Sequence, residues 1–111
     1  MGVTKTNLFS EQQNQLALYA KVMGHPARIA ILEHLLKTNT CINSDLVTEL
    51  GLAQATISQH LRELKEVGMI QGTIEGVSIC YCINQSKWEE VHQTFVHFFN
   101  QYVQPSINKC C

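Results

Sequence analysis

The stretch 52–70 constrains the fold of this chain more than any other part of the sequence. Its residues Ile57, Leu61 and Leu64 recur at a spacing of i, i+4 and i+7, which places them on one face of a helix. Gly68 follows these positions and is suited to a left-handed helix cap. The rest of the helix surface is polar but carries few charges. It offers Gln54, Thr56, Ser58, Gln59, His60 and Arg62.

Amide, hydroxyl and guanidinium groups are the groups that bind base edges and phosphates in the major groove of DNA. A polar helix face is also what a solvated surface helix presents, so the neighbouring elements have to decide between the two interpretations. A short helix is expected over 43–50, and a tight turn at 51–53 contains Gly51. A helix, a glycine turn and a second helix over 54–67 together form a helix-turn-helix pattern.

Two runs of alternating residues follow, at 69–75 and 77–84, with a hinge at Glu75 and Gly76. This pattern predicts a β-hairpin, and a hairpin directly after such a helix makes a wing. In the second strand, Tyr81 and its neighbours at every other position should face the core. The sequence therefore predicts a winged helix-turn-helix of the α+β class, mainly helical.

The remaining segments are expected to be helical. Ser10 and Gln13 fit a capping box that opens a helix to about Met23, and 27–37 should form the apolar central helix. A second capping box starting at Ser86 should open a last helix to about Gln104. The expected organisation is a flexible N-terminus at 1–8, one domain at 9–104 and a C-terminal tail at 105–111.

The last expected helix has an aromatic stripe that could close the core of a monomer or cover a partner. The stripe comprises Trp88, Val91, Phe95, Phe98, Phe99 and Tyr102. The charged fraction of 15% is low for the surface of a monomer, which indicates that a partner covers part of this surface.

Composition limits both the partner and the compartment. A chain of 111 residues with 45% hydrophobic residues can form one domain with a core. The net charge of −1 is unlike that of a non-specific nucleic-acid binder, so DNA binding would need well-placed donors or two copies on one operator. No apolar run reaches the length of a membrane span and no export signal is visible. The five cysteines then indicate a reducing compartment, and the cytoplasm is the expected location.

Part of the sequence resembles the bacterial ArsR/SmtB repressors, which are metal- or metabolite-sensing winged-helix dimers. The resemblance lies in 24–32, in 58–70 and in the strand around Tyr81, and it extends over about 15–100. It implies a twofold dimer through the first and last helices and a double-stranded DNA operator as partner. Arg28 matches an arginine of the family, as a DNA contact or as a helix-start residue paired with an acid. His60 belongs to the family's helix motif, in a structural role or as a phosphate contact.

The thiols are the candidate ligands of a sensor. Cys110 and Cys111 are adjacent and could close on an ion together with Cys41. Thiolates select soft ions, so arsenite, antimonite or a soft metal is the expected inducer. A disulfide between Cys41 and Cys110 would be a redox alternative.

Two other sites fit less well. The family's Cys-x-Cys ahead of Asp45 is absent, because Ile42 and Ser44 occupy the corresponding positions. Cys80 and Cys82 share one strand face, where they could bind metal or serve as small apolar fillers.

The sequence thus predicts a DNA-binding transcriptional repressor released by a thiophilic ligand or by thiol oxidation. A winged-helix module that binds another protein is the alternative favoured by the acidic net charge. A thiol enzyme is not expected, because the chain has no Cys-x-x-Cys spacing and no phosphate-binding glycine loop.

Overall fold

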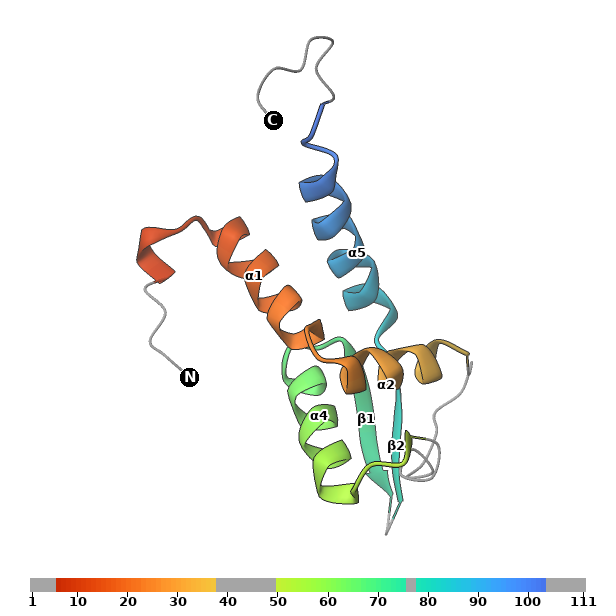
Figure 1. Ribbon diagram of the computed structural model, residues 1–111. Helices are drawn as coiled ribbons and strands as arrows, with labels where there is room; N and C mark the ends of the chain where they lie inside the picture. Colours follow the sequence, from red (N-terminus) through yellow and green to blue (C-terminus); the bar gives the residue numbers. More distant parts are fainter. Residues whose placement is uncertain (1–5, 38–49, 76–77, 104–111) are drawn as a thin grey trace.

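The described residues of the computed structural model are 6–37, 50–75 and 78–103 (Figure 1). A short 3₁₀ turn, Thr6–Leu8, precedes the first helix. The elements that follow are α1 (Glu11–Met23), α2 (Pro26–Lys37), α4 (Gln54–Glu66), β1 (Ile70–Glu75), β2 (Ser78–Ile83) and α5 (Gln85–Phe99). This order confirms the mainly helical winged fold expected from the sequence.

The starts of α1 and α2 depend on side-chain caps. Ser10 Oγ accepts the Gln13 N–H at 3.0 Å and Gln13 Oε1 accepts the Ser10 N–H at 2.9 Å, so the expected capping box is present. The imidazole Nδ1 of His25 accepts the Ala27 N–H at 3.0 Å, at the start of α2. Since the missing N–H of Pro26 would be unpaired in a first turn anyway, proline fits this position.

Leu50 is helical and ends the segment that was expected to form the helix 43–50, whose other residues lie outside the described part. Gly51 then turns the chain with φ +68°. At the other end of α4, Gly68 has φ +86°, which confirms the left-handed cap. The Gly68 N–H donates to the Lys65 carbonyl at 2.9 Å and the Met69 N–H to the Leu64 carbonyl at 3.1 Å. These two bonds form a Schellman motif, which satisfies carbonyl groups at the helix end.

The two strands pair antiparallel, with Ile70 opposite Ile83 and Gly72 opposite Tyr81. Tyr81 and Ile83 pack against the core, as the alternation predicted. A Cβ atom on Gly72 would lie 2.6 Å from Tyr81 Cδ1, so the Tyr81 ring occupies the space that a side chain at position 72 would need.

The core lies where α2 crosses between α4, the hairpin and the end of α1 (Figure 1). Ile31, Leu35, Leu64, Met69 and Ile70 are at most 1% exposed. Each such side chain contributes about 1.5–3 kcal/mol by leaving water. The expectation that α2 is the central helix is confirmed.

The start of α5 differs from the sequence prediction. Asn84 caps the helix, since its side-chain oxygen accepts the Lys87 N–H at 3.3 Å, and Ser86 already lies in the first turn. The main-chain N–H of Asn84 donates to the Met69 carbonyl at 3.0 Å, so the end of the hairpin fixes where the helix begins. The helix also ends at Phe99, five residues before the expected Gln104, which itself lies outside the described part.

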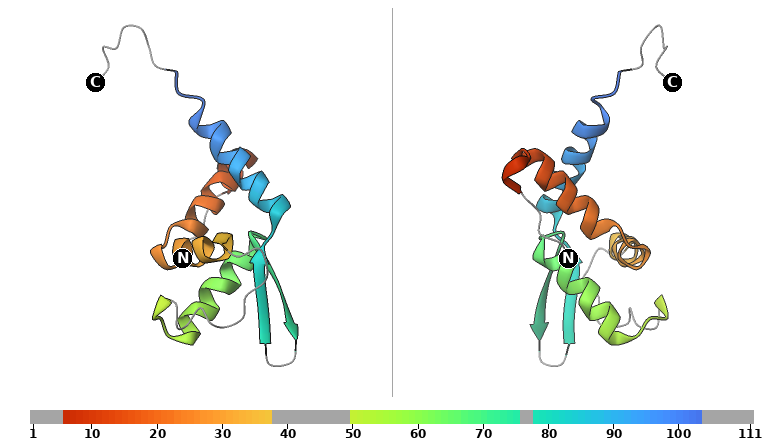
Figure 2. Two further views of the ribbon diagram at one scale, coloured as in Figure 1. Left: turned by 90° about the vertical axis from the view of Figure 1, so that its right-hand side faces the viewer. Right: turned by 60° about the vertical axis from the view of Figure 1, so that its left-hand side comes forward.

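Helices α1 and α5 extend from the core as two arms, which separate in the view of Figure 1 and cross in the two views of Figure 2. None of the described helices combines the length and the apolar character needed to cross a bilayer.

Candidate nucleic-acid interface

Helix α4 has one buried face and one exposed face. Ile57, Leu61 and Leu64 are 3%, 7% and 0% exposed, as the spacing predicted. Five of the six candidate DNA contacts are exposed, and they are Gln54, Thr56, Ser58, Gln59 and Arg62. At 100° per residue, Ser58, Gln59 and Arg62 point away from the core, while Gln54 and Thr56 flank them near the helix start. The structure therefore brings these five side chains together on one accessible surface, which we call the α4 outer face.

The first turn of α4 has no side-chain cap. Ala53 occupies the N-cap position and forms no such hydrogen bond. The first N–H groups of a helix have no partner within the helix, and they attract anions such as phosphate. The start of α4 can therefore accept a DNA phosphate beside Gln54.

Arg62 is held in place by a chain of hydrogen bonds along the helix. Its Nη1 donates to Gln59 Oε1 at 2.9 Å, and Gln59 Nε2 donates to Glu63 Oε2 at 3.0 Å. Glu63 in turn pairs with Arg28 Nη2 at 2.7 Å. The hydrogen bond from Gln59, followed by the charge of Arg28, lowers the pKa of the Glu63 carboxyl.

The ion pair with Arg28 reduces the unfavourable effect that the charge of Glu63 would have on DNA binding. The carboxylate of Glu63 is neutralised by a guanidinium from α2, so its repulsion of phosphate is reduced. Lys65 is turned the other way, because its Nζ donates to the Gly72 carbonyl at 3.3 Å. Arg62 is the basic side chain of α4 that remains directed to the outer face.

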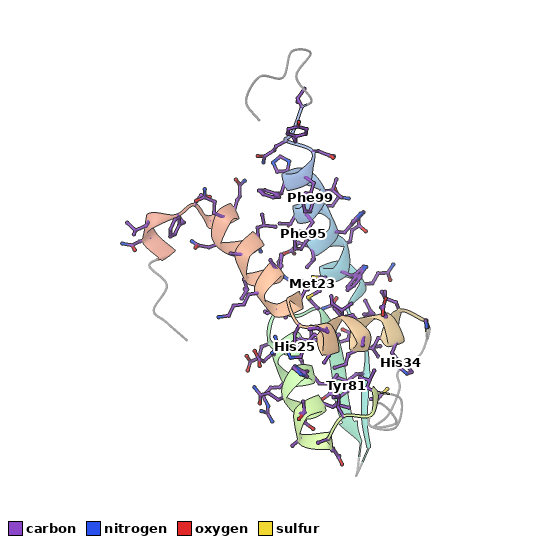
Figure 3. All side chains as sticks on the ribbon, in the orientation of Figure 1. Met23, His25, His34, Tyr81, Phe95 and Phe99 are labelled. Carbon is purple, nitrogen blue, oxygen red and sulfur yellow. The ribbon has the colours of Figure 1, made fainter. Side chains whose placement is uncertain are left out.

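His60 does not belong to the α4 outer face. It is only 6% exposed, and its Nδ1 accepts a hydrogen bond from Arg28 Nε at 2.9 Å. The centroid of its ring lies 4.5 Å from that of the His25 ring. Figure 3 shows His25 at the place where α1, α2 and α4 meet. A buried imidazole is not accessible to a duplex, so the burial of His60 favours the structural role expected for it over a phosphate contact.

Arg28 connects three helices, and we call its contacts the Arg28 network. Its Nη1 donates to the Val22 carbonyl of α1 at 3.1 Å, in addition to its contacts with His60 and Glu63 of α4. Its side chain is 12% exposed. Burial, then the charges of Arg28 and His25, lower the pKa of His60, so its neutral, hydrogen-bond-accepting form is favoured. Of the two roles expected for Arg28, the structure shows the helix-start residue paired with an acid.

The sequence analysis missed part of this network. Glu63 was not singled out, although it is one residue from Arg62 and four from Gln59. The burial of His60 had a signal, since it lies three residues after Ile57 and four before Leu64, on the apolar face.

The ends of α1 and α5 form a second candidate surface, which is the expected contact surface for a partner. The expected aromatic stripe is only partly covered: Val91 is buried, Trp88 and Phe95 are half-buried, and Phe98, Phe99 and Tyr102 are 49%, 67% and 73% exposed. Phe95 and Phe99 follow one another along α5 in Figure 3, and their ring centroids are 6.3 Å apart. A groove of about 580 Å³ lies between α1 and α5, and the residues that line it are mostly polar and include Gln13, Leu16, Thr94 and Phe98.

Close to the core, a polar cluster joins the two arms. Tyr19 Oη donates to Glu90 Oε2 at 2.6 Å, and Lys87 Nζ lies 3.1 Å from the same oxygen. Gln15 donates to Tyr19 Oη at 2.9 Å. This cluster, which no local sequence pattern indicates, links α1 to α5.

The candidate ligands of a sensor site, Cys41, Cys110 and Cys111, lie outside the described residues. Within the described ranges, no group of three or more His, Cys, Asp or Glu side chains is placed to hold a metal ion.

A turn between helices, an exposed polar second helix and a following hairpin define the winged helix-turn-helix class. The family model described as "Bacterial regulatory protein, arsR family" matches residues 25–71, which include α2, α4 and the start of the hairpin. The chain belongs to the ArsR family, since two relatives that are more than 30% identical align with it over more than two thirds of their own length.

The regulator MJ1325 of Methanocaldococcus jannaschii is 31% identical over 81 residues, which are 73% of this chain and 91% of that protein. The transcriptional repressor PagR of Bacillus anthracis is 32% identical over 71 residues, which are 64% of this chain and 71% of that protein. The regulator Rv0081 of Mycobacterium tuberculosis is 33% identical over 67 residues, 60% of this chain, and the match spans about three fifths (59%) of that protein. The crystal structure of Rv0081 superimposes with a TM-score of 0.62 at 23% identity, covering 84% of this chain and 96% of that one, which supports the fold.

Proposed function

We propose that this protein is a DNA-binding transcriptional repressor that inserts α4 into the major groove of its operator. The observation that carries the proposal is the α4 outer face, where Gln54, Ser58, Gln59 and Arg62 are exposed on a helix fixed to the core from behind. Arg62 is oriented by Gln59 before any DNA is bound, which reduces the ordering cost of binding. Relatives named as transcriptional regulators and as a repressor support the same function.

We propose further that two copies bind one operator. The exposed aromatic end of α5 supports a second copy as partner, because large exposed apolar patches mark protein interfaces. A dimer would place two α4 helices about one helical turn of DNA apart, so the operator should be a near-palindrome. DNA binding would also place the protein in the cytoplasm, as expected from the sequence.

The test is fluorescence anisotropy of a labelled duplex from the protein's own promoter region, with the wild type, Arg62→Ala and Lys37→Ala. Arg62→Ala should weaken binding about 5- to 150-fold, because one good contact to a base or phosphate is worth about 1–3 kcal/mol. Lys37→Ala removes the same charge from an exposed residue at the end of α2, and should have a smaller effect.

Salt dependence supplies the second readout. If Arg62 contacts a phosphate in each of the two bound copies, the slope of log K against log salt falls by about 1.8 in Arg62→Ala. Equal losses in both variants would mean that net charge alone governs binding, and the proposed helix surface would be wrong. No binding of the wild type at low salt would refute the DNA-binding function and favour a protein-binding module.

We also propose that release from DNA is controlled through thiols, with Cys110 and Cys111 as first candidates and Cys41 as a third ligand. Arsenite added to the wild-type complex should release the duplex, whereas the Cys110→Ser/Cys111→Ser variant should stay bound. Release in both proteins would exclude the terminal pair as the sensor.

A further inference from the structure

The outer side of the hairpin carries a pair of thiols that the proposed DNA interface does not use. Cys80 and Cys82 are two residues apart on β2, and both are free and half-buried. Tyr81, between them, packs against the core. Because side chains alternate along a strand, the two cysteines share the opposite face of the hairpin. Figure 2 shows α2 and α4 together on one side of the two strands.

We propose that Cys80 and Cys82 form a two-coordinate site for a soft monovalent metal ion, of which Cu(I) is the biological example. Soft thiolate ligands select Cu(I) over hard cations. The described part of the chain offers no third His, Cys, Asp or Glu beside them. A structural zinc site needs four ligands, so two thiolates favour an ion that is satisfied by two.

The spacing of the pair suits a bridging ion better than a disulfide. Two positions apart on a strand correspond to about 6.7 Å between equivalent backbone atoms. A disulfide requires its Cβ atoms to be about 3.8 Å apart. If the ion is taken to lie about 2.3 Å from each sulfur, as zinc does from thiolates, a linear arrangement separates the two sulfurs by about 4.6 Å. Side-chain rotation of the two cysteines can reach this separation without moving the strand.

Gln71 supplies a supporting contact to one of the thiols. It lies directly opposite Cys82 in the register, and its Nε2 donates toward Cys82 Sγ at 3.8 Å. Hydrogen bonds from neighbouring groups orient the residues that bind a metal ion, so a donor at this place favours the bound state. Metal binding requires both thiols to release their protons to solvent.

The test measures Cu(I) affinity anaerobically by competition with the chromophoric chelator bathocuproine disulfonate. The informative protein is a Cys41→Ser/Cys110→Ser/Cys111→Ser variant, in which Cys80 and Cys82 are the remaining thiols. It should bind one Cu(I) per chain. Adding Cys80→Ser or Cys82→Ser should weaken binding at least a hundredfold, and adding Gln71→Ala should weaken it severalfold.

Several results would overturn the proposal. These are absence of Cu(I) binding by the triple variant, two ions per chain, one ion per two chains, or unchanged affinity after loss of either cysteine. Circular dichroism checks that each variant is folded. The binding of Cu(I) to the triple variant tests the proposed site directly, because Cys80 and Cys82 are both intact in that protein. The assay contains no DNA, so its outcome is separate from that of the proposed repressor function.

Discussion

The Arg28 network makes a quantitative prediction about stability. Arg28→Ala removes the hydrogen bonds to the Val22 carbonyl and to His60 Nδ1, and the ion pair with Glu63. A hydrogen bond from a charged donor contributes about 1.5–3 kcal/mol. The Glu63 side chain is 38% exposed, so its ion pair adds less than about 1 kcal/mol. In Arg28→Ala, water can enter part of the vacated space and hydrogen-bond to the groups that Arg28 leaves, which keeps the loss near the lower end of the range for two such bonds. We therefore expect the free energy of unfolding to fall by about 3 kcal/mol.

Arg62→Ala is the matched control, because it also removes an arginine side chain. Arg62 lies at the exposed end of the series of contacts that runs through Gln59 and Glu63 to Arg28. Arg62 donates to Gln59 on the surface, and its loss should change stability by less than about 0.5 kcal/mol. Urea unfolding at pH 7.5 measures both variants, at one fixed protein concentration because a dimer unfolds with mass action.

The two arginines should therefore have opposite profiles. Arg28→Ala should lower the urea midpoint strongly, whereas Arg62→Ala should keep the midpoint and lose DNA affinity. If the midpoints of the two variants differ by no more than the error of the fit, the claim that Arg28 fixes α4 to α1 and α2 is refuted.

Three further results are expected. The stability of the wild type should fall as the pH drops below 6.5, because burial lowers the pKa of folded His60 and the unfolded chain then binds more protons; urea midpoints from pH 7.5 to 5 should show a weaker decline in His60→Gln. Gly72→Ala should cost about 2 kcal/mol in thermal unfolding, because its Cβ would lie 2.6 Å from Tyr81 Cδ1, and a wild-type melting temperature would contradict this packing. Tyr19→Phe should cost about 1 kcal/mol by removing the bond to Glu90, and an unchanged melting temperature would show that the cluster does not join the arms.

The sequence predicted the helices and strands whose signals are local. Ile57, Leu61 and Leu64 are buried as their spacing requires, and Ser10 with Gln13 forms the expected capping box. The helix start at Asn84 was missed, because both Asn84 and Ser86 have side chains that can cap a helix. Only the hydrogen bond from the Asn84 N–H to the Met69 carbonyl in the hairpin selects Asn84.

The candidate site was predicted in part, because exposure on a helix is periodic but contacts between helices are not. Gln59 and Arg62 could be assigned to the outer face from their positions on α4 alone. The pairing of Arg28 with Glu63 and His60 joins residues about thirty positions apart, and no local pattern indicates it. Gly76 of the expected hinge and the cysteines of the tail lie outside the described residues, so the expected turn and the expected sensor site stay predictions.

The central claim is that the α4 outer face lies in the major groove of an operator. The most direct measurement is protection of guanine N7 from dimethyl sulfate, because that atom is exposed in the major groove. Guanines should be protected in two half-sites about one helical turn apart, and this protection should be lost in Arg62→Ala. A bound complex in which every guanine N7 remains reactive would contradict it.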